Sequence, residues 1–517
     1  MRNFNRRQFL NMLATVGGSS LAYQASAAMG LISTSSGKRS ISLHSAKKGK
    51  NKIVILGAGI SGLAAAYELE RAGYQCIILE ASHRAGGRVF TARHGDLIDE
   101  LGAPSICQFD DDPDLYMNCG AARIPGHHER TLHYCKTFNV PMRIIANSNR
   151  LAYLHDSNNF DGKPIRIGEH IADSRGFVAE LAQKAIDSSR FDAELSKDDI
   201  ENLSNFLNVF GDLDEAGNYV GSERSGALGD RMLSKPELRT PPALKDLVNS
   251  PLFSRIQRMT ELYDWAEPLM TPVGGMDKIV DGFLNNIATP IHYNSQVSAI
   301  KLHESGVHIA YSQKGEMKTI DADYCFNCIP AHFMNGIVNN FSTEYKQALN
   351  TLKRGKLFKI GFQMKERFWE KENIYGGISY TNLPIRQVWY PSSGIFSNKG
   401  IMLGAYVWEE KQYDYFARLT PQKRLEVAAA MGDQIHPNYS SYIETGISIP
   451  WSRMNHMMGC GSTMSTEDRK RYFTRLQKPE GRHFMMGDQI SYHPGWQEGA
   501  LAAMETSLAH FSELVEA

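Results

Sequence analysis

The segment between residues 52 and 88 constrains the fold more than any other part of the chain. It opens with an apolar run at residues 53–56, of the β-branched kind that forms buried parallel strands. Gly57, Gly59 and Gly62 follow at G-x-G-x-x-G spacing. Glycines at these positions allow a tight turn, the approach of a pyrophosphate to the backbone, and close packing of the next helix. The segment therefore predicts a dinucleotide cradle, with an ordinary glycine-rich turn as the alternative.

The residues after the glycines favour the cradle. We expect a helix at residues 63–71 that ends at Gly73, and a second strand at residues 76–79 that closes on Glu80. A phosphate would lie at the helix N-terminus, and the Glu80 carboxylate would accept hydrogen bonds from both ribose hydroxyls. This order of elements predicts a Rossmann-type unit.

The residues that continue from Glu80 carry a family resemblance. Residues 80–88, Glu-Ala-Ser-His-Arg-Ala-Gly-Gly-Arg, resemble the E-A-x-x-R-x-G-G-R signature of the FAD-dependent amine oxidase superfamily. The resemblance implies FAD as the cofactor. It also implies that Arg88 lies against the FAD pyrophosphate, a role that suits the planar donor fork of a guanidinium.

Later segments resemble the same superfamily. Residues 274–276, Gly-Gly-Met, match the point at which the chain re-enters the flavin domain, and Val297 matches a residue whose backbone contacts the adenine region. Residues 494–500 are similar to the closing G-W-x-x-G-A motif, whose helix start would face the flavin. Trp496 would then form a wall of the substrate site. Asp488 stands where the superfamily carries glutamate, so its contact with the FAD diphosphate or ribityl region is less firmly implied.

Residues 118–125 are similar to the G-x-M-R-x-P segment of L-amino acid oxidases, in which the arginine binds the substrate carboxylate. The resemblance implies this role for Arg123, although Ala122 replaces the usual methionine; a surface arginine is the alternative. In the strands that resemble the substrate domain, it implies that Lys359 contacts a water at flavin N5 and that Tyr406 lies beside the carboxylate. An edge-strand lysine and a core tyrosine are the alternatives.

Cys460 falls where monoamine oxidases carry the cysteine that bonds covalently to the flavin. L-Amino acid oxidases usually have glycine there, and a buried inert thiol is the favoured alternative. Covalent attachment is therefore one hypothesis for this residue.

The resemblance implies that Lys359 is the catalytic residue. It also implies one set of residues that contact the substrate and one set that contact FAD. The expected substrate contacts are Arg123, Tyr406, Gly495 and Trp496. The expected FAD contacts are Gly57, Gly59, Ile60, Ser61, Gly62, Glu80, Ala81, Arg88, Gly120, Ala121, Arg123, Val297, Gly487, Asp488, Gly495 and Trp496. We expect no metal, because Cys325 and Cys328 lack a second pair of ligands and lie in an apolar segment typical of a strand.

The N-terminus predicts export. Asn5-Arg6-Arg7 and the residues after it resemble a twin-arginine signal, and a short apolar stretch leads to Ala25-Ser26-Ala27, a small-residue cleavage site. We expect a signal peptide at residues 1–28 and a flexible linker at residues 29–50, hence a periplasmic or secreted protein. The alternative is a disordered basic tail.

The remaining chain predicts an α/β protein. It would contain a Rossmann-type FAD-binding domain of discontinuous segments, a mixed-sheet substrate domain and a helical insertion. The expected boundaries are FAD-binding segments at 51–100, 268–335 and 448–517, substrate segments at 101–165 and 336–447, and a helical domain at 166–267.

The formal net charge is zero over 517 residues, which argues against nucleic acid as a partner. Seven cysteines in so long a chain do not make a disulfide framework. The partners we expect are an amino acid substrate and oxygen, without a membrane span, and a homodimer is one option for assembly.

The function implied by the resemblance is oxidative deamination of L-amino acids. Hydride would pass from the substrate Cα to flavin N5, with 2-oxo acid, ammonia and hydrogen peroxide as products. Two alternatives stay open: a monoamine or polyamine oxidase, which would have no use for a carboxylate-binding arginine, and a flavin-binding protein without turnover.

Overall fold

The structure is a computed structural model. It describes residues 43, 51–187, 196–229, 232–233, 235, 237–265 and 267–516. The expected signal peptide and all but one residue of the expected linker lie outside the described residues, as does the proposed cleavage site. Among the residues described, no helix combines the length and the apolar character needed to cross a bilayer.

A five-stranded parallel sheet forms the centre of the FAD-binding domain. Its strands come from three separated parts of the chain. In spatial order they are β14 (Ile291–His292), β2 (Gln75–Leu79), β1 (Lys52–Leu56), β18 (Tyr324–Asn327) and β27 (His483–Met485). Cys325 lies within β18, and Cys328 follows its end.

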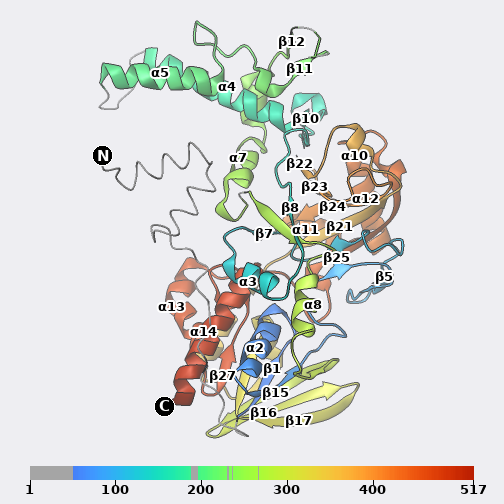
Figure 1. The fold of residues 1–517 in the computed structure, drawn as a ribbon, viewed down its shortest axis with the longest axis vertical. Coiled ribbons are helices and arrows are strands. Elements are labelled where there is room, and N and C mark those ends of the chain that lie inside the picture. Colours follow the sequence, from blue (N-terminus) through green and yellow to red (C-terminus); the bar gives the residue numbers. More distant parts are fainter. Residues whose placement is uncertain are drawn as a thin grey trace, which may run out of the picture.

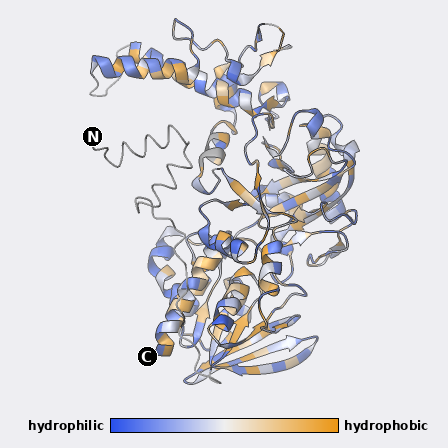
Figure 2. Cartoon of the chain, viewed as in Figure 1, coloured by the Kyte–Doolittle hydropathy of each residue, from blue (hydrophilic) through white to orange (hydrophobic). Residues whose placement is uncertain are grey.

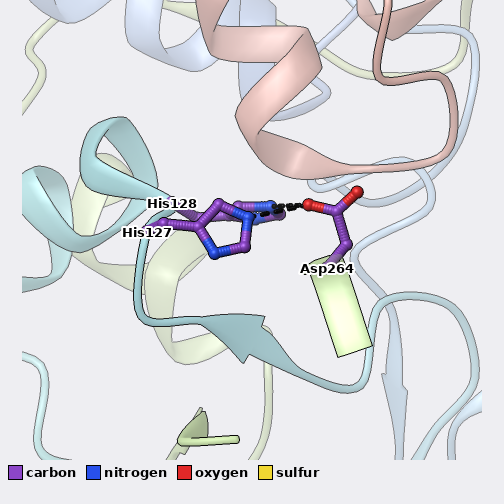
Figure 3. A group of neighbouring side chains, drawn as sticks. All are labelled: His127, His128 and Asp264. Carbon is purple, nitrogen blue, oxygen red and sulfur yellow. Dashed lines mark hydrogen bonds and ion pairs between the residues drawn. The ribbon is translucent and has the colours of Figure 1, made fainter. Parts of the chain in front are cut away.

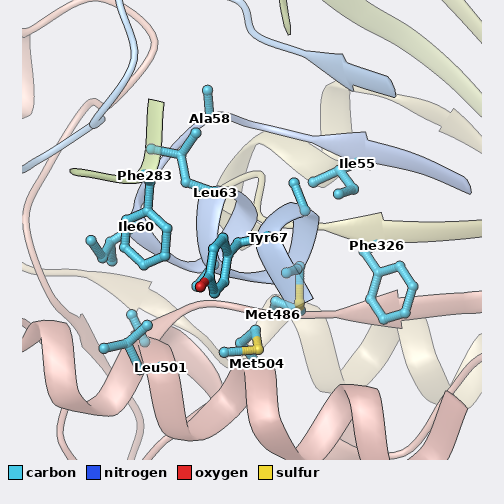
Figure 4. Packing of buried hydrophobic residues seen from close by; sticks show 14 of the residues in the cluster. Ile55, Ala58, Ile60, Leu63, Tyr67, Phe283, Phe326, Met486, Leu501 and Met504 are labelled. Atoms are coloured by element: carbon cyan, nitrogen blue, oxygen red, sulfur yellow. The ribbon is translucent and has the colours of Figure 1, made fainter. Parts of the chain in front are cut away.

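Apolar side chains bury both faces of this sheet, which is why β1 is an unbroken apolar run. Helices α2 (Ile60–Arg71) and α14 (Gln497–Glu516) pack on one face, where Leu63, Met504 and Phe326 belong to one buried cluster (Figure 4). A second cluster on the other face joins Val54 to strands of a four-stranded sheet. Its order is β17 (Glu316–Ala322), β16 (Gly306–Gln313), β15 (Ser295–His303) and β19 (Val338–Asn339).

The substrate domain is built on a seven-stranded mixed sheet, which confirms the expected class of fold. All of its pairs are antiparallel except β22 with β9. In order the strands are β10 (Ile165–Arg166), β9 (Tyr153–His155), β22 (Gly377–Thr381), β23 (Gln387–Tyr390), β24 (Gly400–Val407), β21 (Phe358–Met364) and β25 (Ile443–Pro450). Helices α10 (Phe368–Lys371), α11 (Glu410–Ala417) and α12 (Pro421–Gly432) belong to the same domain (Figure 1).

The described helices of the insertion are α4 (Ile167–Asp187), α5 (Lys197–Gly211), α6 (Leu244–Asn249) and α7 (Phe253–Glu261). Helices α4 and α5 project from the body as an arm, whereas α7 lies between this arm and the body (Figure 1). Figure 2 shows that α4 and α5 carry both hydrophilic and hydrophobic residues along their lengths. The arm also contains a short hairpin of β11 (Ala227–Leu228) and β12 (Glu237–Leu238), for which the sequence carries no strong strand signal.

One helix boundary differs from the expected one. Helix α2 begins at Ile60 rather than at residue 63, because the N–H of Leu63 already donates to the carbonyl of Gly59, at 3.0 Å. Helix α8 spans Lys278–Leu284. Its last turn closes where the N–H groups of Asn285 and Asn286 donate to the carbonyls of Asp281 and Phe283.

Candidate active site

The glycine loop after β1 forms one wall of a cavity. A Cβ atom at Gly62 would lie 2.1 Å from the carbonyl oxygen of Gly57, so only glycine lets the helix approach the strand this closely. A Cβ at Gly59, by contrast, would meet nothing within 4 Å, because that position faces open space in the cavity. The free backbone N–H groups of the first turn of α2 therefore border a space suited to an anionic group.

Glu80 lies at the carboxyl end of β2, beside this loop. Its carboxylate accepts hydrogen bonds from the N–H groups of Ala58, at 2.6 Å, and Ser82, at 2.7 Å. Burial raises the pKa of Glu80, although these hydrogen bonds oppose the shift. Each carboxylate oxygen retains a second lone pair for a ribose hydroxyl, so the predicted role remains chemically available.

Arg88 makes a bidentate ion pair with Asp488, which the sequence did not predict. Nη1 donates to Oδ2 at 2.9 Å, and Nη2 donates to Oδ1. The same Oδ2 accepts the backbone N–H of Gly495, at 2.6 Å, just before α14. Both residues line the cavity, so the pair connects the signature after β2 with the closing motif of the chain.

Arg354 brings a second positive charge to this region, and no sequence motif indicates it. Its Nε and Nη2 atoms are buried without a hydrogen-bond partner among the described residues. Burial and then the nearby charge of Arg88 lower the pKa of Arg354 to about 9. The charges of Arg88 and Arg354 thus both act on one carboxylate, Asp488, although only Arg88 is bonded to it, and the excess positive charge suits the diphosphate of a dinucleotide.

One cavity of about 540 Å³ collects nearly all of the predicted site residues. Gly62 and Lys359 are not among its lining residues, because Gly62 packs on the loop and the Lys359 side chain is turned to backbone carbonyls. The predicted residues that do line it are Gly57, Gly59, Ile60, Ser61, Glu80, Ala81, Arg88, Gly120, Ala121, Arg123, Val297, Tyr406, Cys460, Gly487, Asp488, Gly495 and Trp496.

Arg123 lies in an aromatic cage. Its guanidinium carbon is 3.9 Å from the ring centre of Trp265 and 4.8 Å from that of Trp389. Nη1 donates to Oδ1 of Asn147 at 3.0 Å, and the residue is 6% exposed. Burial lowers the pKa of Arg123, and no carboxylate of the described residues forms an ion pair with it. Arg123 is therefore a buried cation without an acidic partner.

The sheet topology explains how this cage forms. A three-stranded sheet has the order β7 (Ile124–Pro125), β13 (Leu269–Pro272) and β8 (Met142–Ile145). Arg123 directly precedes β7, Asn147 follows β8, and Trp265 ends η3 (Tyr263–Trp265), a short 3-10 helix that leads into β13. The insertion thus contributes a wall of the site through Trp265, a residue that no sequence signal singled out.

Lys359 and Tyr406 are opposite each other on the antiparallel strands β21 and β24. The Nζ atom of Lys359 donates to the carbonyl oxygens of Gly120, at 2.7 Å, and Asn118, at 3.1 Å, and lies 4.7 Å from the Tyr406 ring centre. Burial lowers the pKa of Lys359 to about 8 and raises that of Tyr406 to about 12. Tyr406 therefore stays protonated at neutral pH, whereas Lys359 titrates near it.

The Rossmann-type sheet, the glycine cradle and the cavity lined by Arg88 and Arg123 are features of a dinucleotide-binding protein. The model of the family described as flavin containing amine oxidoreductase matches residues 60–504. The chain belongs to this family and depends on FAD. The open cradle at Gly59 fits this cofactor, and Glu80, Arg88 and the first turn of α2 are the groups that would hold it.

Two oxidases of L-amino acids are similar in sequence to this chain over most of their length. A flavin-dependent L-tryptophan oxidase of Lentzea aerocolonigenes is 27% identical over 491 residues, which cover 89% of this chain and 97% of that protein. An L-amino-acid oxidase of Pseudechis australis is 25% identical over 489 residues, 89% of this chain and 87% of that one. A solved putrescine oxidase bound to putrescine has a TM-score of 0.61 at 16% identity, covering 90% of this chain and 99% of its own, and this likeness concerns the fold.

Proposed function

We propose that the protein is an L-amino acid oxidase, which converts an L-amino acid, oxygen and water to a 2-oxo acid, ammonia and hydrogen peroxide. The observation that carries the proposal is Arg123, buried in an aromatic cage without an acidic partner among the described residues. The similarity to oxidases of L-amino acids supports the same substrate class.

A buried cation is costly unless an anion compensates it. The α-carboxylate of an amino acid would supply that anion and would accept two parallel hydrogen bonds from the guanidinium. Asn147 holds Nη1 from one side, and the two indole rings keep the guanidinium in place. A simple amine carries no group that uses this arrangement, so the geometry favours an amino acid over an amine.

The protein's part in the reaction is orientation, exclusion of water and control of protonation. When bound, FAD supplies the hydride acceptor and the reaction with oxygen. Arg123 would fix the carboxylate, so that only one enantiomer presents its Cα hydrogen in the reactive direction. The proton that leaves the substrate ammonium would pass to water near Lys359, whose Nζ is buried outside the cavity lining and has a pKa of about 8. The imino acid product then hydrolyses to the 2-oxo acid and ammonia.

A peroxide-coupled screen of the twenty L-amino acids, several D-isomers and common amines tests the proposal. We expect Arg123→Ala to lower kcat/KM for L-amino acids by about a hundredfold, because loss of a charge-assisted partner costs about 3 kcal/mol. Arg123→Lys should not restore the rate, since an ammonium cannot form the bidentate pair. Arg166→Ala is the matched control, because Arg166 also stacks on a ring, that of Tyr153, but does not line the cavity.

Two results would contradict the proposal. If amines are the better substrates and Arg123→Ala stays within a few-fold of wild type, the protein is an amine oxidase. If the flavin is bound but no substrate yields peroxide, the protein binds flavin without turnover.

A further inference from the structure

His127, His128 and Asp264 converge at one point beside the cavity (Figure 3). The two histidines directly precede helix α3 (Glu129–Thr137), whereas Asp264 comes from η3, at the end of the insertion. Nε2 of His127 lies 2.8 Å from Oδ1 of Asp264, and Nε2 of His128 lies 3.3 Å from the same oxygen. The three ligand atoms all lie within 4.8 Å of one another.

We propose that these three side chains bind a divalent transition metal of the Zn²⁺ type. Two imidazoles and one carboxylate are a ligand set that Zn²⁺ accepts and that Mg²⁺ and Ca²⁺, which prefer oxygen, do not. Ligand atoms around tetrahedral zinc lie about 3.3 Å apart, from bond lengths of about 2.0–2.1 Å. The cluster therefore needs only side-chain adjustments to reach this geometry.

The surroundings support a metal site over a merely hydrogen-bonded group. The two imidazole rings stand at 89° to each other, so they approach the common point from different directions. The ring of Tyr263 stacks on that of His127, with 4.1 Å between ring centres. The rings of Trp496 and His128 meet edge to face, with 5.0 Å between ring centres. These contacts restrict the movement of both imidazoles. The side chains of His127 and Asp264 are 28% and 25% exposed, which leaves an entry path and an open coordination position.

The cluster of His127, His128 and Asp264 lies beside the substrate site, so a metal bound there would affect that site. His128 lines the cavity, and Asp264 is next in sequence to Trp265, which contacts Arg123. A bound ion would join the end of the insertion to the start of α3 at the wall of the substrate site. Its effect on turnover rests on the proposed function, whereas metal binding itself does not.

The test uses untagged holoenzyme, stripped with a chelator and titrated with Zn²⁺ by calorimetry and with Co²⁺ by absorption. We expect one site per chain with the visible bands of tetrahedral Co²⁺. Asp264→Asn, which keeps the shape of the side chain, and His127→Ala should each weaken binding by at least about a hundredfold. His133→Ala is the matched control, since His133 is an exposed histidine on α3 itself.

Flavin absorbance and thermal unfolding verify that each variant is folded. Wild type that binds Zn²⁺ no more tightly than the double variant His127→Ala/Asp264→Asn would overturn the proposal. So would an equal loss of affinity in His133→Ala, or a loss below tenfold in both single variants. Because these readouts need no substrate, failure of the metal site and failure of the oxidase assignment can be told apart.

Discussion

The ion pair between Arg88 and Asp488 joins residues that lie 400 positions apart in the sequence. Arg88 follows the second strand of the FAD-binding sheet, and Asp488 follows the last one. Since Asp488 also accepts the N–H of Gly495, the pair fixes the start of α14 against the glycine cradle. A single carboxylate thereby sets the shape of the cofactor cavity.

We expect Asp488→Asn to destabilise the holoenzyme by up to about 3 kcal/mol, because it leaves the partly buried Arg88 cation without its partner. Thermal unfolding followed by flavin fluorescence measures the change. Asp281→Asn, in the exposed pair with Lys278, is the control and should shift stability by less than about 0.5 kcal/mol. Equal effects in both variants would refute the structural role of the pair.

The Arg88–Asp488 pair also predicts how the stability of the folded protein depends on pH in the acid range. Burial raises the pKa of Asp488, but Arg88 more than offsets this and the net pKa falls below the ordinary value of 3.8. The carboxylate therefore contributes its stability fully above about pH 4 and loses it as the pH falls through the lowered pKa. Asp488→Asn should flatten the acid limb of the stability curve, and an unchanged acid limb would contradict this assignment.

Lys359 should govern the pH dependence of flavin reduction. Below its pKa of about 8 the side chain is an ammonium, and above it a neutral amine that can receive a proton. The limiting rate of flavin reduction in stopped flow should rise as the pH increases through about 8, and Lys359→Met should remove this step. Lys365→Met, an exposed lysine just after the same strand, should keep it. Retention of the step in Lys359→Met would exclude Lys359.

Trp265 should affect substrate binding more than cofactor binding. Loss of a cation–π contact costs about 0.5–2 kcal/mol, so Trp265→Ala should lower kcat/KM for L-amino acids by up to about thirtyfold. The flavin spectrum should stay unchanged, because Trp265 contacts Arg123 and is not among the groups expected to hold FAD, which are Glu80, Arg88 and the first turn of α2. Trp265→Phe keeps a ring and should retain more activity than Trp265→Ala; the opposite order would argue against the cage.

Cys460 offers a test of covalent attachment. It lines the cavity, and its backbone carbonyl accepts a hydrogen bond from Arg88 at 3.2 Å. We expect acid precipitation to give a yellow supernatant and a colourless pellet, as for a free thiol beside a dissociable cofactor. A yellow pellet that becomes colourless in Cys460→Ala would establish the covalent bond instead.

The FAD cradle could be predicted from the sequence because the residues that form it are close together in the chain. Gly57, Gly59, Gly62 and Glu80 occur within one strand–helix–strand unit, where spacing alone fixes their relative positions. Asp488 was assigned to the cofactor by resemblance, but only the three-dimensional structure shows that Arg88 neutralises it.

The substrate cage could not be predicted in this way. Trp265, Trp389 and Asn147 reach Arg123 from three distant segments, and each is an ordinary core or loop residue by sequence alone. The same holds for Arg354, a basic residue in the short strand β20 (Lys353–Arg354) whose isolation becomes visible only after folding. Contacts of this kind depend on sheet topology rather than on local pattern.

The order of strands in the FAD-binding sheet has a consequence for biosynthesis. The outer strand β27 and the helix α14 come long after β1 in the sequence, yet they complete the sheet and the cavity that β1 begins. Contacts of such long sequence separation form late. We therefore expect the cavity to close around the flavin only after residues 483–516 have been synthesised and have packed against β1.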